Sequence, residues 1–247
     1  MNRFTFSPDD IASRIMVALD FPHVKEAETC IGLLAGTGVY VKVGMQLYYA
    51  AGPEYVTRLK QEGYAVFLDL KVHDIPNTAR GAMQSMASLG VDMVNLHVAG
   101  GRKMMEAARE GVEKGTPAGT RRPLLIGVTQ LTSTDRAAMN NEIGIAGSIE
   151  DCVARYARLA QKAGLDGVVA SPKEVPLIKD VCGPDFLTVT PGIRPRGSDI
   201  GDQHRVTTPE DAFSLGSDYV VIGRAITQAP DPRKALDDII QRIRSAE

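Results

Sequence analysis

Three charged residues within six positions are the clearest chemical signal in this chain. Asp69, Lys71 and Asp74 follow an apolar run that begins at residue 65 and is typical of a buried strand. Side chains alternate across a strand with period two, so Asp69 and Lys71 are expected on the same side. Charged side chains at the end of a buried strand need partners or a chemical role. The pattern predicts a lysine that donates a proton between two carboxylates.

Polar residues also end the neighbouring apolar runs. Asp20 ends the first run, and Lys42 lies near the end of the second. Asn95 and His97 end the fourth run. Burying two lysines with two aspartates carries a desolvation cost that apolar residues would avoid, so stability alone explains such a set poorly. We therefore expect an alternating charge network in one mouth of the fold, formed by Lys42, Asp69, Lys71 and Asp74.

Two segments that combine glycine with arginine indicate a phosphate site. One ends at Arg194 after the seventh apolar run, and the other contains Gly223 and Arg224 after the eighth. Loops at these two places of an eight-stranded barrel frequently bind phosphate through backbone N–H groups. Glycine allows close approach of the backbone, and arginine supplies a bidentate partner. Thr132 and Ser133 follow the fifth run and either bind a polar ligand edge or cap the next segment, with binding favoured for Thr132.

The spacing of apolar runs predicts the frame that positions these residues. Strands are expected at residues 15–20, 39–43, 65–71, 91–96, 124–129, 167–170, 186–190 and 219–222. Helices are expected at residues 23–35, 46–62, 76–89, 102–114, 149–163, 172–181, 209–215 and 232–244. Eight such units, with no linker between them, predict an α/β fold: a single-domain (β/α)8 TIM barrel of parallel strands over residues 1–247. An open, doubly wound sheet is the alternative.

Composition argues against several classes of partner and site. A net charge of −2 and a pI near 6.1 give no electrostatic reason to expect a nucleic-acid partner. The apolar runs are of strand length, and the N-terminus lacks an apolar signal core, so we expect a cytoplasmic protein with no membrane partner. The three cysteines and four histidines are scattered without metal-ligand spacing, so no metal site is expected.

Five segments resemble the orotidine 5'-phosphate decarboxylases in their bacterial form. The most specific is Asp-Leu-Lys-Val-His-Asp-Ile-Pro-Asn-Thr at residues 69–78. The others are Val-Ala-Leu-Asp at 17–20, Val-Lys-Val-Gly at 41–44, Thr-Pro-Gly-Ile-Arg at 190–194 and Ile-Gly-Arg at 222–224. The resemblance implies decarboxylation of orotidine 5'-phosphate to uridine 5'-phosphate and CO2, the last step of de novo pyrimidine biosynthesis. It also implies that no metal or organic cofactor takes part.

The resemblance implies a role for each matching residue. Lys42, Asp69 and Lys71 would form the charged network, while Asp74 and Thr78 would reach the neighbouring site of a homodimer. Asp20 would hold the ribose hydroxyls, Thr132 would contact the pyrimidine, and Pro191 would pack near it. The phosphate would be held by Arg194, Gln203, Gly223 and Arg224, and residues 194–203 would belong to a loop that closes on the substrate.

The chemistry of this reaction explains the need for a lysine. Loss of CO2 from C6 leaves a carbanion in the ring plane, with no adjacent carbonyl to delocalise it. Lys71, kept protonated by Asp69 and Asp74, would stabilise that charge and protonate C6. Two alternatives stay open: a Mg²⁺-dependent sugar-phosphate decarboxylase or synthase on the same scaffold, and a catalytically silent barrel that only binds a nucleotide.

Overall fold

The eight expected strands form one closed barrel. The computed structural model describes residues 11–195 and 207–246. Every strand pairs in parallel with the next, and the last pairs with the first, so the fold is a (β/α)8 barrel and the open-sheet alternative is wrong. The strands are β1 (Ile15–Ala18), β2 (Tyr40–Gly44), β3 (Ala65–Val72), β4 (Met93–His97), β5 (Leu124–Val128), β6 (Gly167–Val169), β7 (Leu187–Thr190) and β8 (Tyr219–Ile222).

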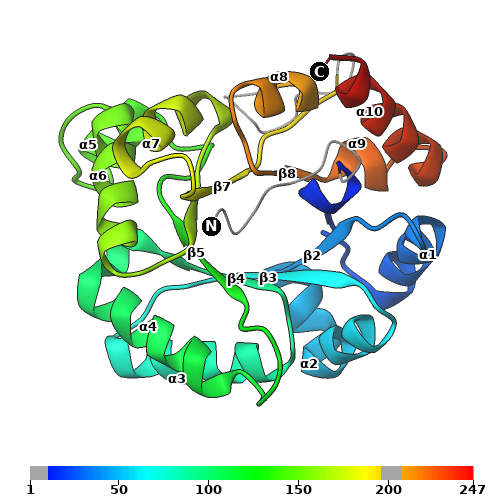
Figure 1. Ribbon diagram of the computed structural model, residues 1–247, viewed down its shortest axis with the longest axis horizontal. Helices are drawn as coiled ribbons and strands as arrows, with labels where there is room; N and C mark the ends of the chain where they lie inside the picture. The colour runs from blue at the N-terminus through cyan, green and yellow to red at the C-terminus, as the bar shows by residue number, and fades with distance from the viewer. Residues whose placement is uncertain (1–10, 196–206, 247) are drawn as a thin grey trace.

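Helices surround this barrel (Figure 1). They are α1 (Val24–Leu34), α2 (Met45–Gln61), α3 (Pro76–Ser88), α4 (Gly101–Gly115), α5 (Arg136–Asn141), α6 (Ile149–Lys162), α7 (Val175–Cys182), α8 (Pro209–Ser214), α9 (Arg224–Thr227) and α10 (Pro232–Ala246). Short 3-10 turns occupy Ala12–Arg14, Val98–Gly100 and Pro172–Glu174. Within the part of the chain that the structure describes, no helix combines the length and apolarity needed to cross a membrane.

Three helical details differ from expectation. Helices α5 and α9 were not predicted, because segments of six and four residues are too short to show an apolar period. The helix expected over residues 172–181 is a 3-10 turn followed by α7. Helix α2 is bent at Gly52, whose φ is 76°, directly before Pro53, because proline cannot continue the hydrogen-bond ladder of a helix.

Alternation along the strands divides the apolar residues between two cores. Val66 and Leu68 of β3 face outward and pack with the surrounding helices in the larger core. Phe67 faces inward and packs with Met93 and Ile126 in a smaller core inside the barrel. The side-chain alternation predicted for β3 is therefore confirmed, and it directs Asp69 into the barrel at the carboxyl end of the strand.

Three aspartates join strand pairs at the amino end of the barrel. Each comes directly before an even-numbered strand and accepts a hydrogen bond from a backbone N–H of the preceding strand. Asp92 accepts from Val66 at 2.7 Å, Asp166 from Leu125 at 2.8 Å, and Asp218 from Thr188 at 2.7 Å. Each also pairs with a cation: Lys60, Arg122 and Lys179 respectively. This end of the barrel is thus fixed by charge-assisted hydrogen bonds, far from the strand ends where chemistry is expected.

Helices α3 and α4 lie in direct backbone contact. A Cβ atom added to Gly111 would come within 2.2 Å of the Arg80 carbonyl oxygen, and one added to Gly115 within 2.2 Å of the Gln84 carbonyl oxygen. Only glycine permits this approach, so α4 supports α3 along its length. Since α3 begins at Pro76, this contact fixes the helix that carries Thr78.

We predict that Asp218→Ala lowers the free energy of unfolding by about 3 kcal/mol, because it leaves the buried Thr188 N–H without its acceptor and removes the ion pair with Lys179. Urea unfolding measures the change. Asp237→Ala removes a surface pair with Arg233 and should change stability by less than about 0.5 kcal/mol. Equal effects of the two substitutions would contradict a structural role for Asp218.

Candidate active site

A cavity of about 340 Å³ opens at the carboxyl ends of the strands. The residues predicted from the sequence that line it are Asp20, Lys42, Asp69, Lys71, Thr132, Pro191, Arg194, Gly223 and Arg224. Gln130, Ser133 and Gly192 also contribute polar or backbone surface. An apolar floor is formed by residues that were not among the predicted site residues: Ala18, Phe67, Val128, Val169, Val189 and Val221. These are inward-facing strand residues, so strict alternation along the later strands could have identified them.

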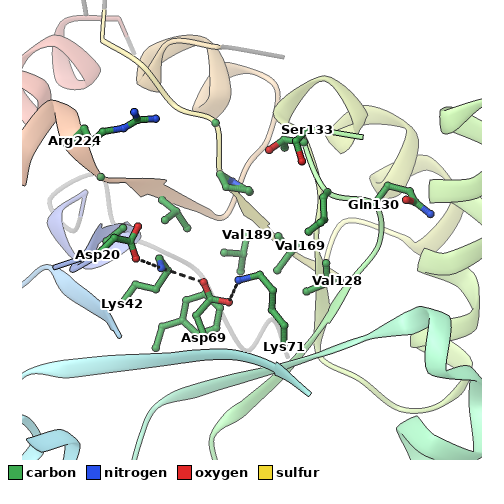
Figure 2. Close-up of a pocket in the computed structure, with 18 of the residues that line it drawn as sticks. Asp20, Lys42, Asp69, Lys71, Val128, Gln130, Ser133, Val169, Val189 and Arg224 are labelled. Carbon is green, nitrogen blue, oxygen red and sulfur yellow. Dashed lines mark hydrogen bonds and ion pairs between the residues drawn. The ribbon is translucent and has the colours of Figure 1, made fainter. Parts of the chain in front are cut away.

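Four charged side chains form a continuous chain of ion pairs in this cavity (Figure 2). Lys42 Nζ lies 3.2 Å from Asp20 Oδ1 and 3.1 Å from Asp69 Oδ2. Lys71 Nζ lies 2.7 Å from Asp69 Oδ1. The charges therefore alternate in sign, with the carboxylate of Asp69 held between two ammonium groups. In Figure 2 the Lys71 side chain extends into the open part of the pocket.

Burial and attraction act in opposite directions on the two central groups. Burial would raise the pKa of the Asp69 carboxyl, but Lys42, Lys71 and hydrogen bonds from Lys71 and Asn95 outweigh it and leave that pKa lowered. Burial would likewise lower the pKa of the Lys42 ammonium, but Asp69 and Asp20 reverse the effect and leave its pKa raised. Both groups are thus ionised at neutral pH, although each side chain is only 9% exposed.

The pairing of β2 with β3 explains why these groups meet. Gly44 lies opposite Asp69 in the register of the two strands. A Cβ atom at Gly44 would come within 3.1 Å of both Asp20 Oδ1 and Lys42 Nζ. The absence of a side chain at Gly44 therefore leaves room for the first ion pair, which gives a physical reason for the glycine in the Val-Lys-Val-Gly segment.

One polar partner of the network was named in the sequence but not proposed as a site residue. Asn95 on β4 donates from Nδ2 to Asp69 Oδ1 at 2.7 Å and is fully buried. The sequence signal that could have identified it as a site residue was its position at the end of a strand, on the inward-facing parity. An uncharged residue there is more often structural, and only the contacts with Asp69 and with the Lys71 backbone distinguish it.

Asp74 and Thr78 are not brought into this network within the single chain. Both residues are exposed, and neither lines the cavity. The Asp74 carboxylate accepts a hydrogen bond from the Ile75 N–H at 2.6 Å. The expectation that all four charges meet in one mouth is therefore wrong for one chain. Gln203 lies outside the described residues, as does most of the loop expected to close on the substrate.

The opposite side of the cavity carries the two glycine–arginine segments. Figure 2 shows Arg224 across the pocket from Lys71. Gly223 precedes Arg224 at the start of α9, and Gly192 adopts φ 80°, a backbone conformation that favours glycine. The Ile193–Arg194 segment is joined to Thr207 through a backbone hydrogen bond from the Arg194 N–H, at 2.9 Å. One side of the cavity therefore presents alternating charges, and the other presents arginine side chains and the backbone of two glycines.

Two histidines lie behind the lysine side of the cavity. The ring centroids of His73 and His97 are 5.6 Å apart. Burial, followed by His73 and Lys71, lowers the pKa of His97 below its ordinary value of 6.5, while Asp69 opposes the shift. Neither histidine lines the cavity.

The lowered pKa of His97 predicts a pH dependence of stability. Below pH 6.5 the unfolded chain binds a proton at this residue before the folded chain does, so its contribution is lost as pH falls. The urea midpoint should drop between about pH 7.5 and about pH 5.5, and His97→Gln should reduce that drop. The same substitution at the exposed His23 is the matched control for exchanging a histidine for glutamine. An unaltered drop in His97→Gln would contradict this role.

Comparison with known proteins identifies the family of this chain. The model of the orotidine 5'-phosphate decarboxylase / HUMPS family matches residues 13–239. The proteins named orotidine 5'-phosphate decarboxylase from Bacillus cytotoxicus and Bacillus cereus are each 52% identical to this chain over 232 residues, which is 94% of this chain and 98% of each relative.

Solved structures agree with the fold. The crystal structure of orotidine 5'-phosphate decarboxylase from Lactobacillus acidophilus is 39% identical, with a TM-score of 0.84 over 93% of this chain and 98% of that one. An uncharacterized conserved protein from Geobacillus kaustophilus is 48% identical, with a TM-score of 0.83 over 93% of this chain and 99% of that one. With the family model matching nearly the whole barrel, the chain belongs to the orotidine 5'-phosphate decarboxylase / HUMPS family.

Proposed function

We propose that this chain decarboxylates orotidine 5'-phosphate to uridine 5'-phosphate and CO2, the last step of de novo pyrimidine biosynthesis. Membership of the family and the 52% identity to proteins named for this activity support the proposal. The observation that carries it is the alternating Asp20–Lys42–Asp69–Lys71 network on one side of a cavity whose other side carries Arg224. The proposal takes residues 1–247 as one barrel domain.

Lys71 is the residue that performs the chemical step. The bond from C6 to the carboxylate breaks, its electron pair stays on C6, and CO2 leaves. The ammonium of Lys71 stabilises the negative charge that develops at C6 and then transfers a proton to it. The neutral amine that results regains its proton from solvent. No electron acceptor is needed, because the only new bond is the one between C6 and that proton.

Asp69 and Lys42 prepare Lys71 for this step. Asp69 accepts a hydrogen bond from Lys71 Nζ, so the ammonium is directed before substrate binds. Lys42 contacts the other oxygen of the same carboxylate and keeps it from turning away. Such preorganised charge stabilises a transition state without reorganisation at the moment of reaction. Asp69 also lies where the substrate carboxylate would bind, and repulsion between the two anions would favour loss of CO2.

The remaining cavity residues hold the parts of the substrate that do not react. Arg224 and Arg194, with the backbone at Gly223, bind the phosphate, and Gln203 is proposed to join them. Asp20, which is more than half exposed, holds the ribose hydroxyls. Thr132 contacts the pyrimidine, and Pro191 packs beside it. Binding energy from the remote phosphate then contributes to ordering the reacting groups.

A second copy of the chain completes the site in this proposal. Asp74 and Thr78 are exposed at the start of α3, and the Ile75 side chain between them is 67% exposed. A single exposed isoleucine is ordinary on a protein surface, so the homodimer is proposed from the resemblance of residues 69–78. In a homodimer these residues would enter the partner's site, and Asp74 would supply the second carboxylate expected beside Lys71.

The Mg²⁺-dependent alternative is less well supported by the donor set. Oδ1 of Asp69 already accepts from Lys71 and Asn95, and Oδ2 contacts Lys42. Two ammonium groups about 3 Å from the same carboxylate repel a divalent cation and occupy the oxygens it would bind.

Turnover of orotidine 5'-phosphate in excess chelator tests the reaction. Loss of the orotate absorbance should be rapid for the unmodified chain, and Lys71→Ala should lower kcat by at least about 10,000-fold, since it removes both the acid and the charge. Lys103→Ala, at an exposed position of α4, should leave kcat unchanged. Near-normal turnover by Lys71→Ala would refute its role, and turnover only with Mg²⁺ and a keto-sugar phosphate would favour the sister activity.

Arg224→Ala should affect binding more than chemistry. Loss of a charge-assisted hydrogen bond, about 1.5–3 kcal/mol, should raise KM by roughly 10- to 100-fold. Steady-state kinetics measure the change, with Arg233→Ala on the exposed surface of α10 as the control. An unchanged KM would refute the phosphate assignment.

Co-expression of Lys71→Ala with Asp74→Ala tests the shared site. Each variant alone should be inactive. A mixed dimer has one site with an intact Lys71 and an intact Asp74 from the partner, so random mixing should restore about one quarter of the activity. No restoration, with mixed dimers present, would mean that both residues serve the same chain's site.

A further inference from the structure

Lys71 has an unusual backbone conformation that the proposed chemistry does not explain. Its φ is 50°, and it is the sole residue other than glycine with positive φ among residues 11–195 and 207–246. The pairing of β3 with β4 is also irregular here, with a register shift between Leu68 and Val72. A left-handed conformation at a lysine carries a cost of roughly 1–2 kcal/mol, so neighbouring structure must hold it.

The side chain of Asn95 makes the contacts that would hold it. Asn95 Oδ1 accepts a hydrogen bond from the Lys71 backbone N–H at 2.8 Å. Its Nδ2 donates to Asp69 Oδ1 at 2.7 Å, and the residue is fully buried. One amide therefore ties the backbone of the lysine to the carboxylate that directs the lysine's ammonium. A carboxamide can accept from an N–H through its oxygen and donate to a carboxylate through its nitrogen at the same time.

We propose that Asn95 is a positioning residue for decarboxylation. Its amide holds the irregular backbone of β3 at Lys71, so that the Lys71 ammonium contacts Asp69 and is directed toward the reacting carbon. The inference rests on the role proposed above for Lys71. Asn95 acts through Lys71 and Asp69, and it does not line the cavity. Small displacements of a reacting group greatly lower a rate without abolishing binding, which is the signature expected here.

The surroundings of Asn95 make a charged substitution informative. The charged or titratable groups near it are Asp69 and Lys71 on β3, Lys42 on β2 and His97 on its own strand. On the other side, β5 presents Ile126 opposite Asn95 and carries no charge. In Asn95→Asp the new carboxylate would still accept from the Lys71 N–H but would repel Asp69. Protonation of the new group would restore a donor to Asp69.

Steady-state kinetics of two variants test the proposal. Asn95→Ala should lower kcat by roughly 10- to 100-fold while KM stays within about threefold, because the phosphate side is untouched. Asn95→Asp should lose activity at neutral pH and recover relative to the unmodified chain as pH falls and the new carboxyl becomes protonated. Thr188→Val is the matched control: it removes a buried hydrogen bond to Asp218 at the opposite end of the barrel. It should reduce stability without changing kcat or the pH profile.

The outcomes separate this inference from the proposed function. If kcat of both Asn95 variants equals that of the unmodified chain while Lys71→Ala is inactive, the positioning role alone is overturned. Loss of stability with unchanged kinetics, as expected for Thr188→Val, would also overturn it. Turnover by Lys71→Ala would instead refute the function on which the inference rests. If Asn95→Ala fails to fold, the pH response of Asn95→Asp decides: a profile parallel to that of the unmodified chain overturns the proposal.

Discussion

The carboxylate of Asp69 is the group on which the rest of this structure depends. A buried anion is tolerated only where cations and hydrogen-bond donors compensate for lost water. Three strands supply them: Lys42 from β2, Lys71 from β3 and Asn95 from β4. The order of strands in the closed barrel makes these three neighbours, and Gly44 leaves the space that the first ion pair needs. The strand order of the fold therefore provides the partners of the one side chain at the centre of the charged site.

Local pattern was sufficient to predict the frame and the charged core of the site. Eight apolar runs predicted eight parallel strands, and the alternation Val66, Phe67, Leu68, Asp69 identified which face enters the barrel. Charged residues at strand ends were informative because burying them is unfavourable without a purpose. Burial of an uncharged side chain is less costly, so only strand parity marked Asn95 and the valines of the cavity floor, and they were not predicted as site residues. Helices α5 and α9 were not predicted because they are shorter than two helical turns.

Other features depend on contacts that no local pattern contains. Regular alternation places Lys71 beside Asp69, yet the strand becomes irregular there, and Asn95 is 24 residues away in sequence. Asp74 was expected near Lys71, but within one chain its carboxylate turns to the Ile75 N–H. Whether a charge completes a site in its own chain or in a partner depends on assembly, which strand parity does not report.

The aspartates at the amino end of the barrel have a consequence for its shear. Closure of eight strands requires a fixed total stagger between neighbours. A slip of one residue would move a strand by about 3.3 Å and break the contact of Asp92, Asp166 or Asp218 with the preceding strand. The stagger of three strand pairs is therefore set at the end remote from the cavity. Loops at the reactive rim can accordingly differ in length and sequence among related barrels without displacing the strands that carry the charges.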